Sequence, residues 1–219
     1  MKIGILTLSA SDNCGSLLQA YALQTVLESR FGVNVEVLDF RCENSREMYD
    51  LFSRKPWKYP RRTLNNLLHF PSVSRQKRDY EDFRRNTLHA SARTFATAEE
   101  LAEVADDYDI LICGSDQVWN VNIPDFDPAY FLGWAGNTKR VAYAPSLGGC
   151  DFSAFPDQQL LKKWLLDFAA VSTREQVGVE CVKDVAGLDI PIVPDPTLLM
   201  TGQQWQAIPG ERIVKEPYI

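Results

Sequence analysis

The chain has 219 residues, of which 45% are hydrophobic and 24% charged, a composition that excludes a disordered or fibrous protein. Its formal net charge of -6 argues against a chain-wide nucleic-acid surface, although arginine and lysine are frequent between Arg54 and Arg93. No apolar run reaches the roughly 20 residues that cross a bilayer, so any membrane contact is expected to be peripheral. The short apolar N-terminus is typical of a buried strand and not of a signal peptide, and we expect a cytoplasmic protein.

The cysteines and histidines indicate neither a disulfide framework nor a metal site. Five cysteines are scattered along the chain without a Cys-x-x-Cys pair, and there are two histidines. A structural zinc site needs four such ligands at close spacing. We therefore expect no metal and no cofactor. Cys14 has no histidine near it in the sequence and is not expected to be a nucleophile.

The first 40 residues predict a strand, a helix and a second strand. Lys2–Leu8 is rich in isoleucine and leucine, as in a buried strand. Apolar residues at spacings of three and four predict a helix from residue 15 or 16 to residue 30, and Gly32 is placed to end it. Val33–Phe40 is the second strand. The order strand, helix, strand indicates a parallel βαβ unit.

Residues 41–95 have a different character, because charged and aromatic residues become frequent and three prolines interrupt the stretch. We expect a helical insertion laid over the sheet or beside a cleft, with Ser74–Leu88 as its clearest helix. The strand-helix alternation then returns, and the whole pattern predicts a doubly wound, mostly parallel, Rossmann-like α/β sheet. The remaining predicted elements are helices at Thr97–Ala105, Pro156–Phe168, Arg174–Val185 and Thr201–Gln206, and strands at Asp109–Cys113, Arg140–Ala144, Ala169–Ser172 and Ile190–Val193.

In such a sheet ligands bind beyond the carboxyl ends of the strands. The first loop there, residues 9–16, leads into a helix, and Asn13 and Gly15 are candidates to present backbone N–H groups to an anion. The Gly-x-Gly-x-x-Gly pattern of a dinucleotide site is missing. The alternative is a simple turn capped by Asn13 or Ser16.

The loop after the strand Asp109–Cys113 carries the side chains of a sugar or polyol site. Amides and a carboxylate hydrogen-bond hydroxyl groups, and an indole stacks on the apolar face of a sugar ring. Asp116 is the candidate catalytic base that takes a proton from a hydroxyl nucleophile. The alternative is a turn in which Asp116 is a cap and Trp119 packs in the core. The candidate ligands are Ser115, Asp116, Gln117, Trp119 and Asn120.

Arg174 is predicted at the end of a strand and in the first turn of a helix. A cation there opposes the helix dipole, so a phosphate or carboxylate ligand would stabilise it. The alternative is an ion pair with Glu175 or another nearby carboxylate. The segment Asp195-Pro196-Thr197 is most simply a tight turn that supports the rim of the site.

Together these segments resemble the polysaccharide pyruvyl transferase family. No single motif is specific, but Gly-Ser-Asp-Gln-Val-Trp-Asn, Ser-Thr-Arg-Glu and Asp-Pro-Thr-Leu-Leu occur here in the family's order. The matching segments are 2–7, 13–23, 114–120, 140–148, 171–175 and 195–199.

The resemblance implies a reaction and an architecture. Family members transfer the pyruvyl group of phosphoenolpyruvate to two hydroxyls of a sugar or polysaccharide precursor as a ketal. Their fold is similar to that of two-domain GT-B glycosyltransferases, with the active site between Rossmann-like halves. The resemblance makes Arg174 a phosphoenolpyruvate ligand, and it places the loop from Ser115 to Asn120 at the cleft.

The resemblance also implies a second α/β domain with an Arg-x-His segment that supplies the acid. Neither His69 nor His89 lies in such a context, so the general acid is not identified. We expect residues 1–212 to be an N-terminal, GT-B-like half with the insertion at about 41–95, and residues 213–219 to begin a second domain missing from this chain. The isolated chain is then expected to be inactive. Two other functions stay open: half of a GT-B-like glycosyltransferase that uses a nucleotide sugar, and a non-catalytic carbohydrate-binding or interaction module.

Overall fold

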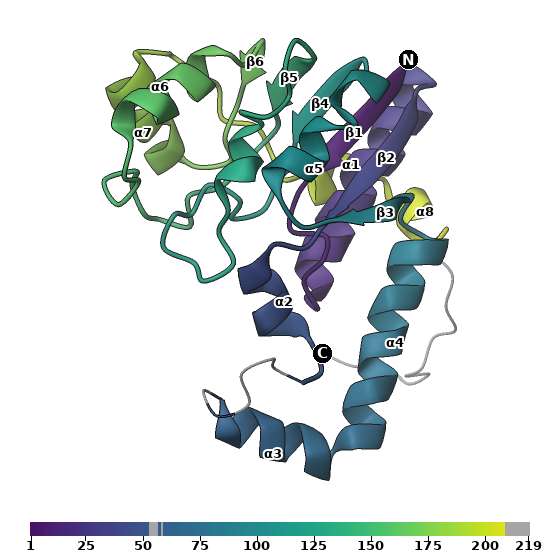
Figure 1. Ribbon diagram of the computed structural model, residues 1–219. Helices are drawn as coiled ribbons and strands as arrows, with labels where there is room; N and C mark the ends of the chain where they lie inside the picture. Colours follow the sequence, from purple (N-terminus) through teal and green to yellow (C-terminus); the bar gives the residue numbers. More distant parts are fainter. Residues whose placement is uncertain (53–56, 58, 209–219) are drawn as a thin grey trace.

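A single parallel sheet forms the centre of the protein in a computed structural model that describes residues 1–52, 57 and 59–208 (Figure 1). The strand order is β3-β2-β1-β4-β5-β6, and every neighbouring pair is parallel. This is the strand order of the doubly wound Rossmann fold, so the predicted fold class is confirmed. The strands are β1 (Lys2–Leu6), β2 (Asn34–Phe40), β3 (Ala90–Phe95), β4 (Ile110–Cys113), β5 (Lys139–Ala142) and β6 (Ala170–Val171).

Helices and short 3-10 turns connect these strands. The predicted first helix is confirmed as α1, and Gly32 ends it with φ of 61°, a left-handed conformation that glycine adopts without a steric cost. The helices are α1 (Cys14–Phe31), α2 (Glu43–Tyr49), α3 (Pro60–Leu68), α4 (Phe70–Asn86), α5 (Ala98–Ala102), α6 (Gln158–Leu166), α7 (Gln176–Ala186) and α8 (Gly202–Trp205); the 3-10 turns are Ala105–Asp107, Pro128–Phe131 and Pro196–Leu199.

Two predictions about strands were wrong. The stretch expected to be a purely helical insertion ends in a strand, β3, whose polar sequence Ala-Ser-Ala-Arg-Thr-Phe suits an edge position that is exposed over most of its length. Conversely, Ile190–Val193 is not a strand, since one isolated bridge joins Ile192 to Thr173. Proline has no N–H group for a ladder, and prolines at 191 and 194 limit the pairing to that bridge.

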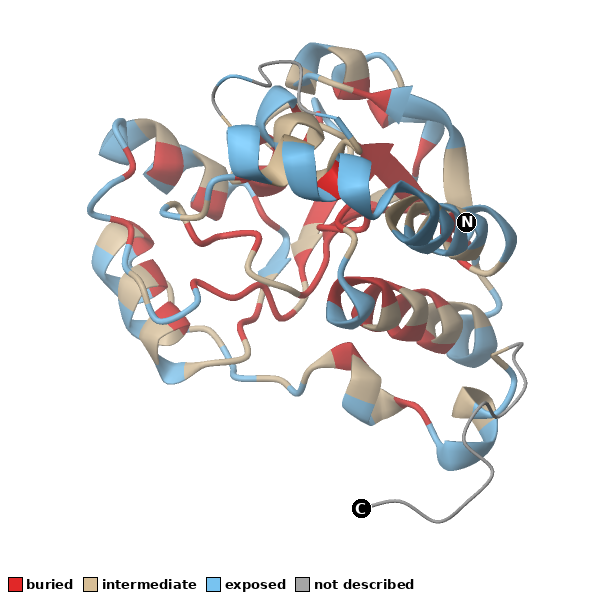
Figure 2. Ribbon diagram, turned by 90° about the horizontal axis from the view of Figure 1, so that it is seen from below, coloured by how far each residue is buried: buried red, intermediate tan, exposed pale blue. Residues whose placement is uncertain are grey.

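The core has two layers because strand side chains alternate between the two faces of the sheet. Ile3 and Ile5 of β1 pack on one side with Leu23 of α1. Leu6 and Phe40 face the other side, where a larger cluster includes aromatic side chains from the loops between β4 and α6. Buried residues accordingly concentrate on the strands and on the loops that follow them (Figure 2). Residues 213–219, expected to begin a second domain, lie outside the described residues.

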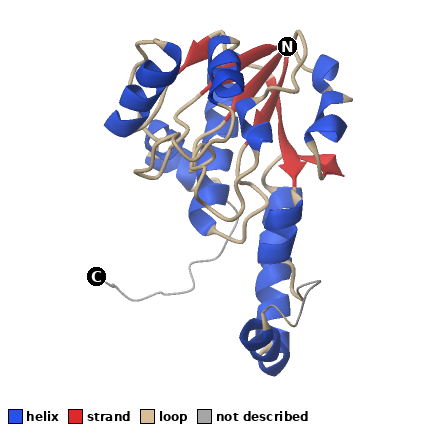
Figure 3. Ribbon diagram, turned by 60° about the vertical axis from the view of Figure 1, so that its left-hand side comes forward, coloured by secondary structure: helices blue, strands red, loops and turns tan. Residues whose placement is uncertain are grey.

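Helices α2, α3 and α4 form the part of the insertion that leaves the sheet, and α3 lies at its far end in two different views (Figures 1 and 3). A buried arginine, Arg84 of α4, joins this insertion to the loop that follows β1. Its guanidinium donates hydrogen bonds to the carbonyl oxygens of Ser9, Ala10 and Ser11 at 2.8, 3.1 and 2.6 Å. It also pairs with Asp12 at 2.9 Å.

Neighbouring ion pairs extend this connection. Lys77, about two turns before Arg84 on α4, pairs with the other carboxylate oxygen of Asp12 at 2.8 Å. Glu81 pairs with Arg84 at 3.3 Å and with Arg41, beyond β2, at 3.1 Å. The insertion and the first loop therefore form one hydrogen-bonded unit.

We predict that Arg84→Met lowers the free energy of unfolding by about 3 to 5 kcal/mol, because it removes a buried cation and leaves the carbonyl groups of Ser9, Ala10 and Ser11 without that donor. Arg85→Met is the matched control, since Arg85 lies on the same helix, is 73% exposed and pairs with Glu81. Its loss should cost less than about 1 kcal/mol. Urea unfolding of the two variants measures both values, and equal destabilisation would contradict the role given to Arg84.

Candidate functional site

The strand order reverses between β1 and β4, where the chain leaves β1 for β2 on one side and β4 for β5 on the other. Loops that diverge at such a point leave a crevice at the carboxyl edge of the sheet, which is where α/β proteins bind ligands. The loops after β1 and β4 are joined there. The hydroxyl of Thr7 donates to the carbonyl oxygen of Ser115 at 2.6 Å, and the amide of Gln19 donates to Thr7 at 2.9 Å.

Asn13 and Gly15 lie exposed at the end of the first loop. Asn13 is the N-cap of α1, and its side-chain oxygen accepts a hydrogen bond from the N–H of Gly15 at 2.8 Å. This is the capped turn that the sequence left as an alternative. It occupies the Gly15 donor in the described structure, and an anion would have to displace the Asn13 side chain to reach that N–H group.

Trp119 is in the core and offers no face to a sugar. Its side chain is completely buried and stacks on Phe131 at a centroid distance of 5.2 Å, with Phe152 and Phe168 against its edges. The expectation that the indole stacks on a ligand is therefore not met, and the alternative interpretation describes Trp119. The physical reason is close packing, because Phe131, Phe152 and Phe168 surround the ring and leave no face open to a ligand.

Asp116 has a backbone conformation that few residues other than glycine adopt, with φ of 95°. Ala144, at the end of the neighbouring strand β5, has φ of 54°. Pairing beyond the strand ends maintains this geometry, since the Ser146 N–H donates to the Asp116 carbonyl at 2.8 Å. One carboxylate oxygen of Asp116 accepts from the Gln117 N–H at 2.8 Å. Strained backbone of this kind is concentrated at functional sites.

Gln117 and Asn120 are partners of each other. The Asn120 amide donates to the side-chain oxygen of Gln117 at 3.1 Å, and both lie against Gly148. A Cβ on Gly148 would lie 2.5 Å from the Asn120 amide, and φ there is 63°. This glycine is thus required for the close approach of the two loops. Gln117 stays half-exposed, whereas Asn120 is buried.

Arg174 and Ser115 share one carboxylate. The guanidinium donates to Asp195 Oδ2 at 2.9 Å, and the Ser115 hydroxyl donates to the same oxygen at 3.3 Å. Asp195 also caps the turn Pro196–Leu199 by accepting from the Thr197 N–H at 3.0 Å. Asp195 is therefore more than the turn residue that the sequence suggested, since it connects the ends of β4 and β6.

The position predicted for Arg174 needs a correction. Helix α7 begins at Gln176 with Glu175 as its N-cap, so Arg174 precedes the helix and does not lie in its first turn. Glu175 does not pair with Arg174 either. Its carboxylate accepts hydrogen bonds from the Ser146 hydroxyl at 2.8 Å and from the Leu147 N–H at 2.6 Å. Among the described residues, the hydrogen-bond partner of the Arg174 guanidinium is Asp195.

Sequence reasoning missed Tyr49, which α2 brings to the same edge. Its hydroxyl donates to Asp125 at 3.0 Å. Burial raises the pKa of Tyr49, and the hydrogen bond to Asp125 and the negative charges of Asp125, Asp116 and Asp12 raise it further. Tyr49 thus lies beside Asp125, and Tyr49 and Asp12 line the same small pocket. No motif marks Tyr49, because only the fold of the insertion brings it there.

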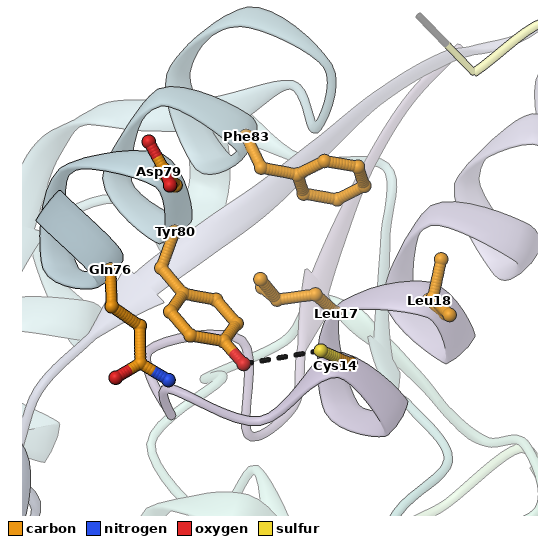
Figure 4. Close-up of a pocket in the computed structure, with 7 residues that line it drawn as sticks. All are labelled: Cys14, Leu17, Leu18, Gln76, Asp79, Tyr80 and Phe83. Atoms are coloured by element: carbon orange, nitrogen blue, oxygen red, sulfur yellow. Dashed lines mark hydrogen bonds between the residues drawn. The ribbon is translucent and has the colours of Figure 1, made fainter. Parts of the chain in front are cut away.

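An apolar pocket of about 400 Å³ lies beside the first loop, between α1 and α4. Tyr80 and Phe83 of α4 face Leu17 and Leu18 of α1 across it, and the Tyr80 hydroxyl points at Cys14 (Figure 4). The Cys14 sulfur and the Tyr80 oxygen are 3.1 Å apart, and this hydrogen bond is the main cause of the raised pKa of Tyr80. Gln76 and Asp79 complete the polar rim.

We predict that Asp195 makes the stability of the protein depend on pH. Burial by itself raises the pKa of Asp195, but hydrogen bonds from Thr197 and the charge of Arg174 outweigh it and hold the pKa below its ordinary value of 3.8. The folded state therefore binds this proton less readily than the unfolded state. The stabilisation is complete above the ordinary pKa and is lost as the pH falls through the lower, folded value.

Unfolding measured between pH 6 and pH 2 tests this expectation. Wild type and Asp195→Asn should differ most at the upper end of that range and converge at the lower end. A difference that is constant across the range would contradict it. Asp106→Asn is a control outside the site, because Asp106 is exposed at the protein surface.

A comparison with known families identifies the family of the chain. No curated protein and no solved structure matches the chain. A family model described as polysaccharide pyruvyl transferase matches residues 13–219, a range that begins at the N-cap of α1 and includes Asp116, Arg174 and Asp195. The chain belongs to the polysaccharide pyruvyl transferase family.

Proposed function

We propose that this chain takes part in the transfer of a pyruvyl group from phosphoenolpyruvate to two hydroxyls of a sugar. The observation that carries the proposal is Arg174, a half-buried cation at the carboxyl edge of the sheet that a single carboxylate holds in place. Family membership supports a transferase acting on a polysaccharide or its precursor. Because phosphoenolpyruvate is a metabolite of the cytoplasm, we assign the reaction to that compartment.

The reaction needs one acid, one base and a phosphate site. A proton adds to the methylene carbon of phosphoenolpyruvate, and the adjacent carbon, now electron-poor, accepts the first sugar hydroxyl, which loses its proton. Phosphate then leaves with the electron pair of its C–O bond. The second hydroxyl adds to the same carbon and loses its proton, which completes the ketal.

Arg174 fits the phosphate site. A guanidinium carries five N–H donors in one plane, and Asp195 engages one nitrogen, Nη1. The remaining donors are available to two oxygens of a phosphate, and the ion pair with Asp195 fixes the plane in which they lie. An arginine held in this way stabilises the charge that builds up as phosphate departs.

Asp116 fits the base. Its Oδ1 is occupied by the Gln117 N–H, so Oδ2 is the oxygen that would accept a proton from the sugar hydroxyl. We propose Gln117 and Asn13 as ligands because both side chains are at least partly exposed, whereas Ser115 and Asn120 are buried and the Gly15 N–H donates to Asn13. The fixed, strained backbone at Asp116 holds the carboxylate in position before substrate binds.

The pocket beside the first loop fits the acceptor. Tyr80 offers the aromatic face that the sequence assigned to Trp119, and Gln76 and Asp79 offer an amide and a carboxylate next to it. Aromatic rings bind the apolar face of a sugar, and the polar groups bind its hydroxyls. The general acid is proposed to come from a second domain, as the resemblance implies.

The resemblance implies a site between two domains, so we predict that residues 1–219 tested by themselves form no ketal, because the residues of one domain do not surround the transition state. The measurement is pyruvyl transfer and phosphate release from phosphoenolpyruvate with galactose- and mannose-type acceptors. Ketal formation above a buffer control would contradict the need for a second domain. Transfer from a nucleotide sugar would instead favour the glycosyltransferase alternative.

We predict that, in an active form of the protein, Arg174→Ala lowers the affinity for phosphoenolpyruvate about tenfold to a hundredfold, because one charged hydrogen bond contributes roughly 1.5 to 3 kcal/mol. Acceptor affinity should change little. Asp116→Asn is the matched variant, and it should lower turnover with little change in donor affinity. Calorimetric titration with phosphoenolpyruvate separates the two. Equal donor affinity in wild type and Arg174→Ala would leave Arg174 as a structural ion pair.

A further inference from the structure

Helix α3 is amphipathic with its polar side turned toward the protein. Arg62 and Asn66 are four residues apart and lie on one face of the helix. The Arg62 guanidinium donates to the carbonyl oxygens of Glu47 and Asp50, and the Asn66 amide donates to the carbonyl oxygen of Leu51 at 2.7 Å. Asn66 is the one buried residue of α3. A helix of a globular domain normally buries its apolar side instead.

The apolar side of α3 is exposed. Leu64, Leu67 and Leu68 follow each other at helical spacing, and their exposed fractions are 58%, 58% and 71%. Phe70, at the start of α4, continues this surface and stacks on Phe52, with both rings about half exposed. We call Leu64, Leu67, Leu68, Phe70 and Phe52 the tip surface. Several large apolar side chains gathered on one exposed surface indicate an interaction site.

The segment that carries the tip surface is strongly cationic. Residues 51–78 contain eight lysines and arginines and no aspartate or glutamate, in a chain whose net charge is -6. Of the described cations, Arg61 is the second residue of α3, about one turn before Leu64, and Arg75 and Arg78 lie exposed on α4, with Arg75 4.0 Å from Asp79. Lys77 is paired with Asp12, so the exposed charge comes from the arginines. The tip surface therefore combines exposed apolar side chains with the positive charge of the segment that carries it.

The tip surface lies away from the carboxyl edge of the sheet. Helix α3 is at the end of the insertion that is farthest from the sheet (Figures 1 and 3). When the molecule is seen from that end, α3 lies in front and is mostly exposed (Figure 2). Nothing in the proposed chemistry uses these residues. Within the described residues no helix is long and apolar enough to span a bilayer.

We propose that the tip surface binds the surface of an anionic lipid bilayer, with α3 lying in the plane of the interface. Leucine and phenylalanine side chains enter the boundary between headgroups and acyl chains, and arginines at their border contact lipid phosphates. The charge favours this occupant over another protein, because a segment of 28 residues without one acidic side chain is complementary to a uniformly negative surface. Trp57, 77% exposed just before α3, is a residue type enriched at that depth.

Co-sedimentation with vesicles tests the proposal. The purified protein should bind vesicles of phosphatidylcholine mixed with phosphatidylglycerol and not vesicles of phosphatidylcholine alone. Leu64→Ser combined with Leu68→Ser should abolish binding. Arg61→Gln combined with Arg78→Gln should lower partitioning about 25-fold, since each cation contributes about fivefold near such a surface. The matched controls, Leu166→Ser and Lys162→Glu on exposed positions of α6, should bind as wild type does.

A second measurement covers the case in which the leucine variant loses the structure of α3. Tryptophan emission of the wild type should shift to shorter wavelength on mixed vesicles, and Trp57→Phe should remove the shift while leaving binding in place. Binding to mixed vesicles that is no stronger than to neutral ones would overturn the proposal. So would a leucine variant that binds as wild type does, or wild-type self-association through this surface without vesicle binding.

Discussion

The guanidinium of Arg84 connects the insertion to the sheet, and the shape of the carboxyl edge depends on it. Three consecutive carbonyl groups, those of residues 9 to 11, point at this one buried cation. Buried carbonyl groups need donors, and neither a strand nor a helix supplies them here. The same loop leads into the cap of α1 and, through Gln19 and Thr7, to the backbone of Ser115. A side chain 75 residues away in the sequence from Ser9 thus sets the geometry of the first loop.

Asp195 has the corresponding role beyond the ends of β4 and β6. It accepts hydrogen bonds from Arg174, Ser115 and Thr197. One carboxylate therefore holds together the loop after β4, the loop after β6 and the turn Pro196–Leu199. Glu175 does the same for the loop after β5. The cation of the site is therefore oriented before any ligand arrives, which reduces the entropy that binding must overcome.

The strand-helix alternation was sufficient to predict the doubly wound sheet, because buried strands and amphipathic helices leave a periodic pattern that local sequence reports. The alternation did not predict β3. An edge strand pairs with one neighbouring strand only, and the polar sequence of β3 lacks the pattern of a buried strand. In the candidate site, the sequence placed Asp116 and Arg174 after two strands, and the structure has them beyond β4 and β6, although Arg174 precedes α7 instead of lying in its first turn. The sequence did not reveal that Trp119 fills the core or that Tyr49 reaches Asp125, since both facts depend on how distant segments pack. The Asp-Pro-Thr motif predicted a turn at Asp195. The motif does not distinguish a turn residue from one that also pairs with an arginine, so the ion pair with Arg174 was not predicted.

The length of α4 determines how far the two ends of the insertion lie from each other. Phe70 is the first residue of α4, and the loop of residues 9–16 contacts the helix at Lys77 and Arg84. With a rise of about 1.5 Å per residue, these contacts lie roughly 10 to 20 Å along the helix axis from the tip surface. If that surface rests on a bilayer, α4 acts as a rigid spacer that holds the carboxyl edge above the headgroups. An acceptor anchored in the membrane then reaches the edge only if its sugar portion extends across that gap, so helix length would select among acceptors by their reach.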